Sequence, residues 1–135
     1  MKDRQQIAEK FGSELQRAAL AKSFFKLTEL WGLTREEEAG LLGWIYREKR
    51  TLLDNLRKGK TSLCSDRDKF ERLVDLLNIH KSLRLLFPYD RKAVYEWIKI
   101  PRERFGGHNA LQIMLEDGKE GISAIRRYLD YERTL

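Results

Sequence analysis

Cysteine, histidine and proline are rare in this chain of 135 residues, which has one cysteine, two histidines and two prolines. Because Cys64 stands alone, no internal disulfide can form, and His80 and His108 do not complete a metal-binding spacing with it. We therefore expect no disulfide framework, no metal site and no cofactor. Cys64 and His80 are interpreted as residues without a chemical role.

Long apolar runs are absent as well. None approaches the roughly 20 residues that a helix needs to cross a bilayer, and residues 1–6 lead into no apolar signal core. We expect a cytoplasmic protein without a membrane partner.

The chain also lacks the motifs that accompany catalysis. It contains no nucleophile elbow, no zinc spacing, no glycine-rich phosphate loop and no carboxylate pair in a cleft-like context. The sequence therefore favours a protein that works by binding, and an enzyme is the less favoured hypothesis.

What the chain does contain is the composition and pattern of helices. Hydrophobic residues make up 41% and charged residues 36%, a balance typical of a folded helical chain. Ser13 with Gln16 and Thr34 with Glu37 form capping-box pairs, each followed by apolar residues at helical spacing. The sequence predicts an all-α fold, with a polar lead over residues 1–12 that precedes the first helix.

Two short helices are predicted after Gly32, one ended by Gly43 and the next running from Tyr46 to Arg57 with Leu52, Leu53 and Leu56 inward. Residues 33–43, Leu-Thr-Arg-Glu-Glu-Glu-Ala-Gly-Leu-Leu-Gly, resemble the first helix and turn of Xre-type DNA-binding domains. The resemblance implies a helix-turn-helix domain over residues 13–64.

Basic residues are concentrated in the second of these helices. Six cationic residues stand against two acidic ones between residues 46 and 60, in a chain of net charge +6. Arg47 and Arg50 share a face and are the best candidates for guanine contacts, while the lysines suit phosphates. The predicted DNA-binding residues are Tyr46, Arg47, Lys49, Arg50, Thr51, Arg57, Lys58 and Lys60. A plain helical hairpin with a basic face is the alternative.

Residues 65–135 are predicted to form a second, small helical domain. We expect Ser65 to cap a long apolar helix that Asn78 divides in two, Asp90 to cap the next helix, and Trp97 to lie in the core. Pro101 ends that segment.

The stretch that follows Pro101 has the residues of a tight connection between two helices. Gly106 and Gly107 allow a tight bend, Asn109 can cap a helix that stops at Gly118, and a final helix is expected from Ile122 to Arg133.

This stretch resembles the C-terminal toxin-binding domain of the Xre/MbcA/ParS antitoxins, and the resemblance extends over roughly residues 33–133. It implies an antitoxin that neutralises a RES-domain toxin, which consumes NAD, and that represses its own operon by binding operator DNA. It also implies a homodimer that assembles into a larger toxin–antitoxin complex. Phe24 and Phe25 are candidates for the dimer contact.

The predicted toxin-binding residues follow the same resemblance. They are Arg102, Arg104, Phe105, Gly106, Gly107, Arg126, Tyr128, Asp130, Tyr131, Glu132, Arg133 and Leu135. A pocket that accepts a pyrophosphate must present cations or N–H donors, so we expect Asp130, Glu132 or the carboxylate of Leu135 to enter it.

Two further readings stay open at this point. One is a stand-alone helix-turn-helix repressor without a toxin partner. The other is an antitoxin that no longer binds DNA, because Trp44-Ile45-Tyr46 provides no capping side chain for the second helix.

Overall fold

The described part of the chain, residues 13–61 and 66–135 of a computed structural model, is entirely helical and contains no strand. The expected all-α fold is confirmed. The α-helices are α2 (Glu14–Leu30), α3 (Arg35–Leu41), α4 (Tyr46–Arg57), α5 (Arg67–Leu86), α6 (Arg91–Glu96), α7 (Ala110–Glu116) and α8 (Gly118–Glu132), with short 3-10 turns η1 (Trp97–Lys99) and η2 (Glu103–Phe105). The predicted lead, residues 1–12, and the predicted boundary between residues 64 and 65 lie outside the described residues.

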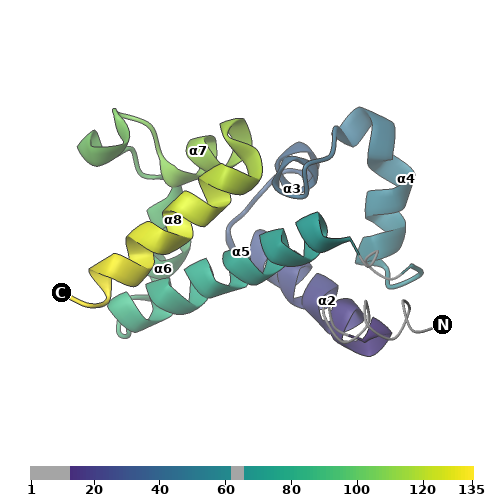
Figure 1. The fold of residues 1–135 in the computed structure, drawn as a ribbon, viewed down its shortest axis with the longest axis horizontal. Helices are drawn as coiled ribbons and strands as arrows, with labels where there is room; N and C mark the ends of the chain where they lie inside the picture. The colour runs from purple at the N-terminus through teal and green to yellow at the C-terminus, as the bar shows by residue number, and fades with distance from the viewer. Residues whose placement is uncertain (1–12, 62–65) are drawn as a thin grey trace.

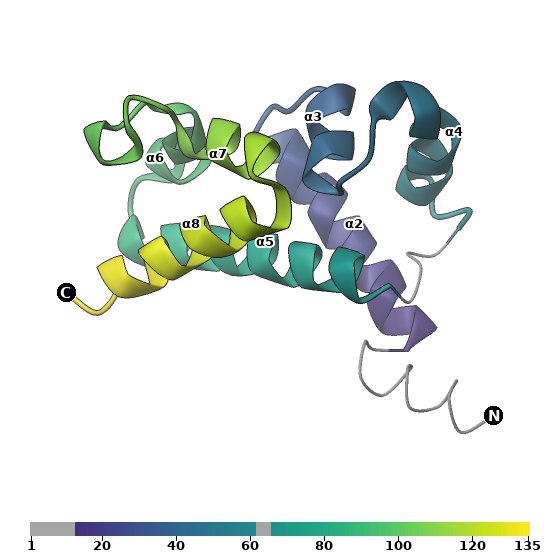
Figure 2. The ribbon, with the colours of Figure 1, turned by 45° about the horizontal axis from the view of Figure 1, so that its top comes forward.

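Helix α5 is the spine of the molecule. Figure 2 shows α8 lying along α5 while α2 crosses it, and α7 packs against α8. The spacing of Leu73, Leu76, Ile79 and Leu83 places four fully buried side chains on one face of α5. The core they enter is a single cluster that continues from Ala21 in α2 to Leu129 in α8. The two predicted halves therefore share one core.

The helix starts are set locally. Capping boxes join Ser13 to Gln16, Thr34 to Glu37 and Asn109 to Gln112, each with both reciprocal hydrogen bonds present. Asp90 caps α6 as expected. Trp97 is buried, as predicted.

Several expectations about individual residues are wrong. The residue that caps α5 is Asp66, whose carboxylate accepts from the Asp68 N–H at 2.8 Å, rather than Ser65. Asn78 does not divide α5, because its side-chain amide donates to the Val74 carbonyl at 2.9 Å within an unbroken helix. Leu52 is 39% exposed, because it lies at the edge of the face of α4 that Leu53 and Leu56 bury.

The expected dimer contact through Phe24 and Phe25 is also corrected. Both rings are buried in the core, 5.1 Å apart in an edge-to-face arrangement. A surface between subunits must use other residues.

Helix α8 starts at Gly118, four residues earlier than predicted. Gly118 has φ +63°, which reverses the chain immediately after α7 and lets the next helix begin at once. The two helices then pack closely at Gly121, where an added Cβ would clash with the carbonyl oxygen of Ile113. None of the helices in residues 13–61 and 66–135 has the length and apolar character needed to cross a bilayer.

Candidate functional site

The α3–turn–α4 unit is fixed to the rest of the protein through a buried carboxylate. Glu38 of α3 is 2% exposed, and its carboxylate accepts hydrogen bonds from the Thr28 hydroxyl and the Arg57 guanidinium. Arg35 adds a third contact at 3.2 Å. The Arg57 guanidinium also lies 4.5 Å from the centre of the Phe25 ring. This network ties α2, α3 and α4 together.

The turn between α3 and α4 is shaped by Gly43. Its φ of +78° lies in the left-handed region, and the Trp44 N–H donates back to the Ala39 carbonyl at 2.8 Å. Arg72 of α5 donates to the Leu41 carbonyl at 3.2 Å, so the end of α3 is satisfied by a side chain from the spine. The turn is therefore a defined element.

Helix α4 begins without a side-chain cap. Ile45 occupies the N-cap position, and Lys49, with φ −120° and ψ 20°, interrupts the helical backbone after the first turn. The irregular first turn presents Arg47 and Arg50 to solvent, and the Arg50 guanidinium lies 5.7 Å from the Tyr46 ring centre. Figure 1 shows α4 at one end of the long axis of the molecule.

The predicted DNA-binding residues divide into two groups. Those that are exposed on or just after α4 are Arg47, Lys49, Arg50, Thr51, Lys58 and Lys60, with Tyr46 half-buried at their edge. Lys58 forms only a solvent-exposed pair with Asp54 at 3.8 Å. Arg57 differs from them, because its guanidinium is bound by the buried Glu38 and its side chain is only 23% exposed. It is therefore a weaker candidate for a phosphate contact than its exposed neighbours.

In the C-terminal half, three aromatic rings form what we call the aromatic corner: Trp97, Phe105 and Tyr128. Phe105 lies edge-on to both other rings, with centroids 6.2 Å from Trp97 and 5.2 Å from Tyr128, and Trp97 stacks on Tyr128 at 6.2 Å. The corner joins η1, η2 and α8, so it holds the loop of residues 102–108 against the final helix.

Two arginines cover the aromatic corner. The Arg102 guanidinium lies 4.4 Å from the centre of the Trp97 ring. Arg104 donates to the Tyr128 hydroxyl at 3.3 Å and to Glu132 at 3.1 Å. A cationic rim therefore surrounds partly exposed aromatic edges.

The loop itself is closed by its own backbone. The Gly107 N–H donates to the Arg102 carbonyl at 3.0 Å, and the Arg102 N–H donates to the His108 carbonyl at 3.1 Å. Gly106 and Gly107 take φ values of +66° and +85° and are exposed at the tip. The tip is a preformed projection beside α8.

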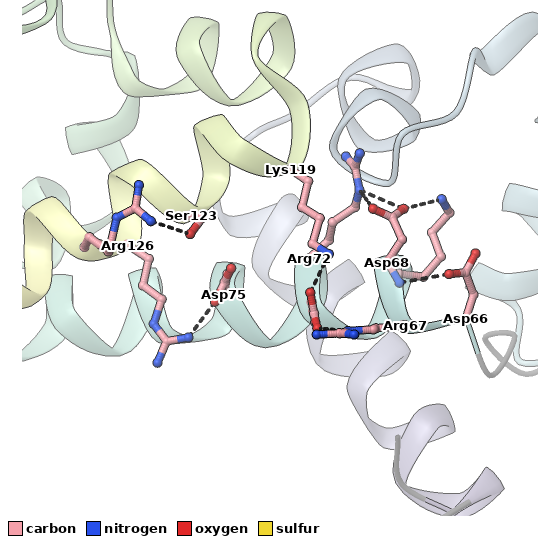
Figure 3. Close-up of polar contacts among 11 residues, drawn as sticks. Asp66, Arg67, Asp68, Arg72, Asp75, Lys119, Ser123 and Arg126 are labelled. Atoms are coloured by element: carbon pink, nitrogen blue, oxygen red, sulfur yellow. Dashed lines mark hydrogen bonds and ion pairs between the residues drawn. The ribbon is translucent and has the colours of Figure 1, made fainter. Parts of the chain in front are cut away.

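Several charged side chains of α8 hold it on α5. Arg126 bonds Asp75 at 2.6 Å, a contact that Figure 3 shows between the two helices. Asp130 lies between Arg126, at 3.6 Å, and Arg133, at 3.8 Å, and accepts from Ser82 at 3.4 Å. These residues form an ionic seam along the α5–α8 contact.

The seam continues to the start of α5, where Figure 3 shows two further clusters. Arg67 and Lys119 both bind Glu71, and their hydrogen bonds, that of Arg67 first, lower the pKa of this carboxyl. Burial would raise the pKa of Asp68, but the hydrogen bonds from Lys69 and Arg72 outweigh it and leave the pKa below its usual value.

Residues 82–134 match the family described as the antitoxin Xre/MbcA/ParS C-terminal toxin-binding domain. The uncharacterized protein y4oB of Sinorhizobium fredii (strain NBRC 101917 / NGR234) is 33% identical over 112 residues, which cover 83% of this chain and 82% of y4oB. The chain therefore carries the C-terminal toxin-binding domain of the Xre/MbcA/ParS antitoxin family. Its role is that of an antitoxin in a toxin–antitoxin system, and its partner is a toxin.

The matched region contains the aromatic corner, the loop of residues 102–108, and α8. Of the predicted toxin-binding residues, the structure brings Arg102, Arg104, Phe105, Tyr128 and Glu132 into direct contact at the corner of the antitoxin. Arg126, Asp130 and Arg133 lie in the ionic seam instead. Tyr131 and Leu135 are 60% and 79% exposed and are the large apolar side chains at the end of α8.

Sequence reasoning missed two residues of these surfaces. Trp97 was expected only in the core, yet it also forms the base of the aromatic corner. Nothing in the sequence around Trp97 indicates its contact with Phe105. Glu38 gave no signal either, because a carboxylate in a run of three is normally solvated. Within the described residues, no three His, Cys, Asp or Glu side chains gather as metal ligands.

Proposed function

We propose that this antitoxin neutralises a RES-domain toxin through its C-terminal half and represses its own operon through α4. The match of residues 82–134 to the toxin-binding domain carries the first part of the proposal. The RES identity of the toxin comes from the family resemblance. A RES toxin consumes NAD, so inhibition means blocking access to its nucleotide pocket.

The toxin-facing surface that the geometry supports best is the projecting loop of residues 102–107 together with the outer face of α8. The side chain of Tyr131 is 60% exposed, so it is free to contact a partner. Tyrosine is a common anchor at protein interfaces. Arg104 and Glu132 would form the polar rim around it.

The expectation that Asp130 enters the pocket is not retained. Its carboxylate is bound by Arg126, Arg133 and Ser82, so its removal from the seam would leave Arg133 without this ionic partner. Glu132, bound only by the exposed Arg104, is the better anion in this proposal.

DNA binding by α4 is supported by its unpaired cations. Within the described residues, Arg47, Lys49 and Arg50 form no ion pair, although acidic residues are plentiful elsewhere in the chain. The uncapped start of the helix adds N–H groups that can donate to a phosphate. A single module of this size binds weakly, so a homodimer on two half-sites is part of the proposal.

The experiment combines co-purification with the product of the neighbouring gene and binding to the operon's own promoter DNA. Replacing Arg47 and Arg50 by glutamine should weaken promoter binding at least tenfold, at about 1–3 kcal/mol per lost base contact. The matched control is Arg67→Gln with Arg127→Gln, which removes the same charge elsewhere. Equal loss in both doubles would contradict a specific role for α4.

The toxin part is tested by Tyr131→Ala. We expect at least tenfold weaker binding of the partner with no change in the unfolding midpoint, because the side chain is exposed. Leu15→Ala, which removes an 82% exposed apolar side chain from α2, is the control. If no neighbouring protein is retained at all, a stand-alone repressor becomes the better account.

A further inference from the structure

A basic groove lies between the second half of α2, the second half of α5, and α6, and neither proposed surface uses it. Three adjoining hollows of about 480, 640 and 710 Å³ share Arg91 and Tyr95 on their walls. Because Arg91 and Tyr95 border all three hollows, the hollows adjoin one another, and we call them together the α2–α5–α6 groove.

The lining of this groove combines apolar side chains with charged ones, and the charged ones are almost all cationic. One acidic residue, Glu96, contributes to it. The cationic side chains are Lys26, Lys81, Arg84, Arg91, Lys92 and Lys99. Among residues 13–61 and 66–135 none of these six forms an ion pair, whereas most charges along α8 do. Such a concentration of one sign in a depression creates a strong positive potential.

Two contacts in the groove agree with that potential. His80 lies on the wall of the groove, with its Nε2 3.1 Å from the Tyr95 hydroxyl. Burial, followed by the charges of Arg84 and Arg91, lowers the pKa of His80. The Arg91 guanidinium sits 5.0 Å from the centre of the Tyr95 ring, so its position is fixed without any carboxylate.

The type of cation indicates the type of ligand. Four of the six are lysines, and lysine is depleted from the centres of protein–protein interfaces but serves well as a point charge for phosphates. Arg84 and Arg91 add forked donors that match phosphate oxygens. Tyr89, fully exposed in the turn between α5 and α6, offers an aromatic face two residues before Arg91 in the sequence.

We propose that the α2–α5–α6 groove binds the phosphate backbone of a nucleic acid, as a second contact surface separate from α4. Figure 1 shows α4 at the right end of the long axis and α6 left of its centre, so the two surfaces contact different stretches of a strand or different molecules. The inference does not depend on sequence reading by α4. A protein that holds nucleic acid at both ends binds non-specific DNA more tightly than its helix-turn-helix alone would allow.

The test compares three double variants of the full chain that each remove two charges: Arg84→Gln with Arg91→Gln in the groove, Arg47→Gln with Arg50→Gln in α4, and Arg67→Gln with Arg127→Gln as the control. Affinity for a duplex of about 30 base pairs of unrelated sequence is measured over a range of salt concentrations. The groove double should bind about tenfold more weakly, and its salt slope should fall by roughly one to two. The control should bind like the wild type.

The two proposals fail separately in this design. If the groove double binds like the wild type while the α4 double is weak, the groove proposal is overturned and the helix-turn-helix stands. If the α4 double is unaffected while the groove double is weak, the reverse holds. Equal loss in all three doubles would reduce the effect to net charge and overturn the groove proposal.

Two further arms identify the ligand and the place. Single-stranded DNA and RNA are compared with the duplex, and the preferred one names the nucleic acid. Polyglutamate should bind poorly; if it binds as tightly and needs the same arginines, the groove serves an acidic protein and the proposal is wrong. Addition of nucleic acid should shift the imidazole NMR signals of His80, while those of the exposed His108 serve as reference. Unmoved His80 signals would contradict binding in the groove.

Discussion

In the first turns of α4 the cationic side chains are exposed, whereas in α8 most charged side chains are bound to a neighbouring segment. Among residues 13–61 and 66–135, Arg47, Lys49 and Arg50 form no ion pair, but Arg126, Asp130 and Arg133 are held against Asp75 and Ser82 of α5. The difference teaches that charge along a helix does not by itself mark a binding surface. A charged side chain without an ionic partner can bind a ligand, whereas one in an ion pair stabilises the fold.

The largest loss of stability is expected at Arg57, the cation of α4 that is bound inside the fold by Glu38. Glu38→Ala would leave the Arg57 guanidinium and the Thr28 hydroxyl without their buried partner. We expect a loss of about 3 kcal/mol in the free energy of unfolding. Denaturation by urea measures it. Glu36→Ala, at an exposed position in the same helix, should change stability by less than about 0.5 kcal/mol.

A steric test of the α7–α8 contact comes next. Gly121→Ala places a methyl group against the backbone carbonyl of Ile113, which cannot move away easily, so a loss of about 2 kcal/mol is expected. In Gly40→Ala the new methyl meets only the end of the Leu115 side chain, which can rotate. The thermal midpoints should therefore separate the two variants, and similar midpoints would mean that α7 and α8 pack less closely than described.

The ionic seam of α8 predicts a smaller loss. Asp75→Ala leaves Arg126, which is about one-third exposed, with only the more distant Asp130. We expect a loss of about 1 kcal/mol, since solvent and Asp130 compensate in part. The α4 double variant Arg47→Gln with Arg50→Gln should show no loss in the same assay. An equal loss in both would remove the contrast between the two helices.

The smallest effect is a dependence on acid pH. The pKa values of Asp68 and Glu71 are lower in the folded protein than in the unfolded chain, so the folded state releases their protons more readily. Their stabilising contribution is fully present above the unfolded values of about 4 and is lost as the pH falls through the lower folded values. Unfolding followed between pH 5 and 2 should show this loss, and Asp68→Asn should reduce it. A flat profile would contradict the ion pairs of Figure 3.

Local signals explain why much of the fold was predictable. Ser13, Thr34 and Asn109 set helix starts through hydrogen bonds to residues three positions away, so nothing beyond a few residues of sequence is needed. The family resemblance, carried by the stretch from Trp97 to Gly118, is confirmed over residues 82–134.

What could not be predicted depends on contacts between distant segments. Arg57 reads as one more cation in a basic helix, and only the approach of α3 reveals Glu38 as its partner, 19 residues away. The α2–α5–α6 groove gathers lysines and arginines from three helices, each of which looks like an ordinary solvated face. The predicted break at Asn78 was wrong because an asparagine can also stay inside a helix. Here its side-chain amide donates to the carbonyl of Val74, one turn earlier.

The most direct test of the account measures NAD loss by the proposed RES-domain partner in the presence of three forms of the antitoxin. These are the wild type, Tyr131→Ala, and the α4 double Arg47→Gln with Arg50→Gln. The account predicts that the wild type and the α4 double suppress NAD loss equally, while Tyr131→Ala suppresses it at least tenfold less well at matched concentration. Full suppression by Tyr131→Ala together with failure of the α4 double would contradict the assignment of the toxin to the C-terminal surface.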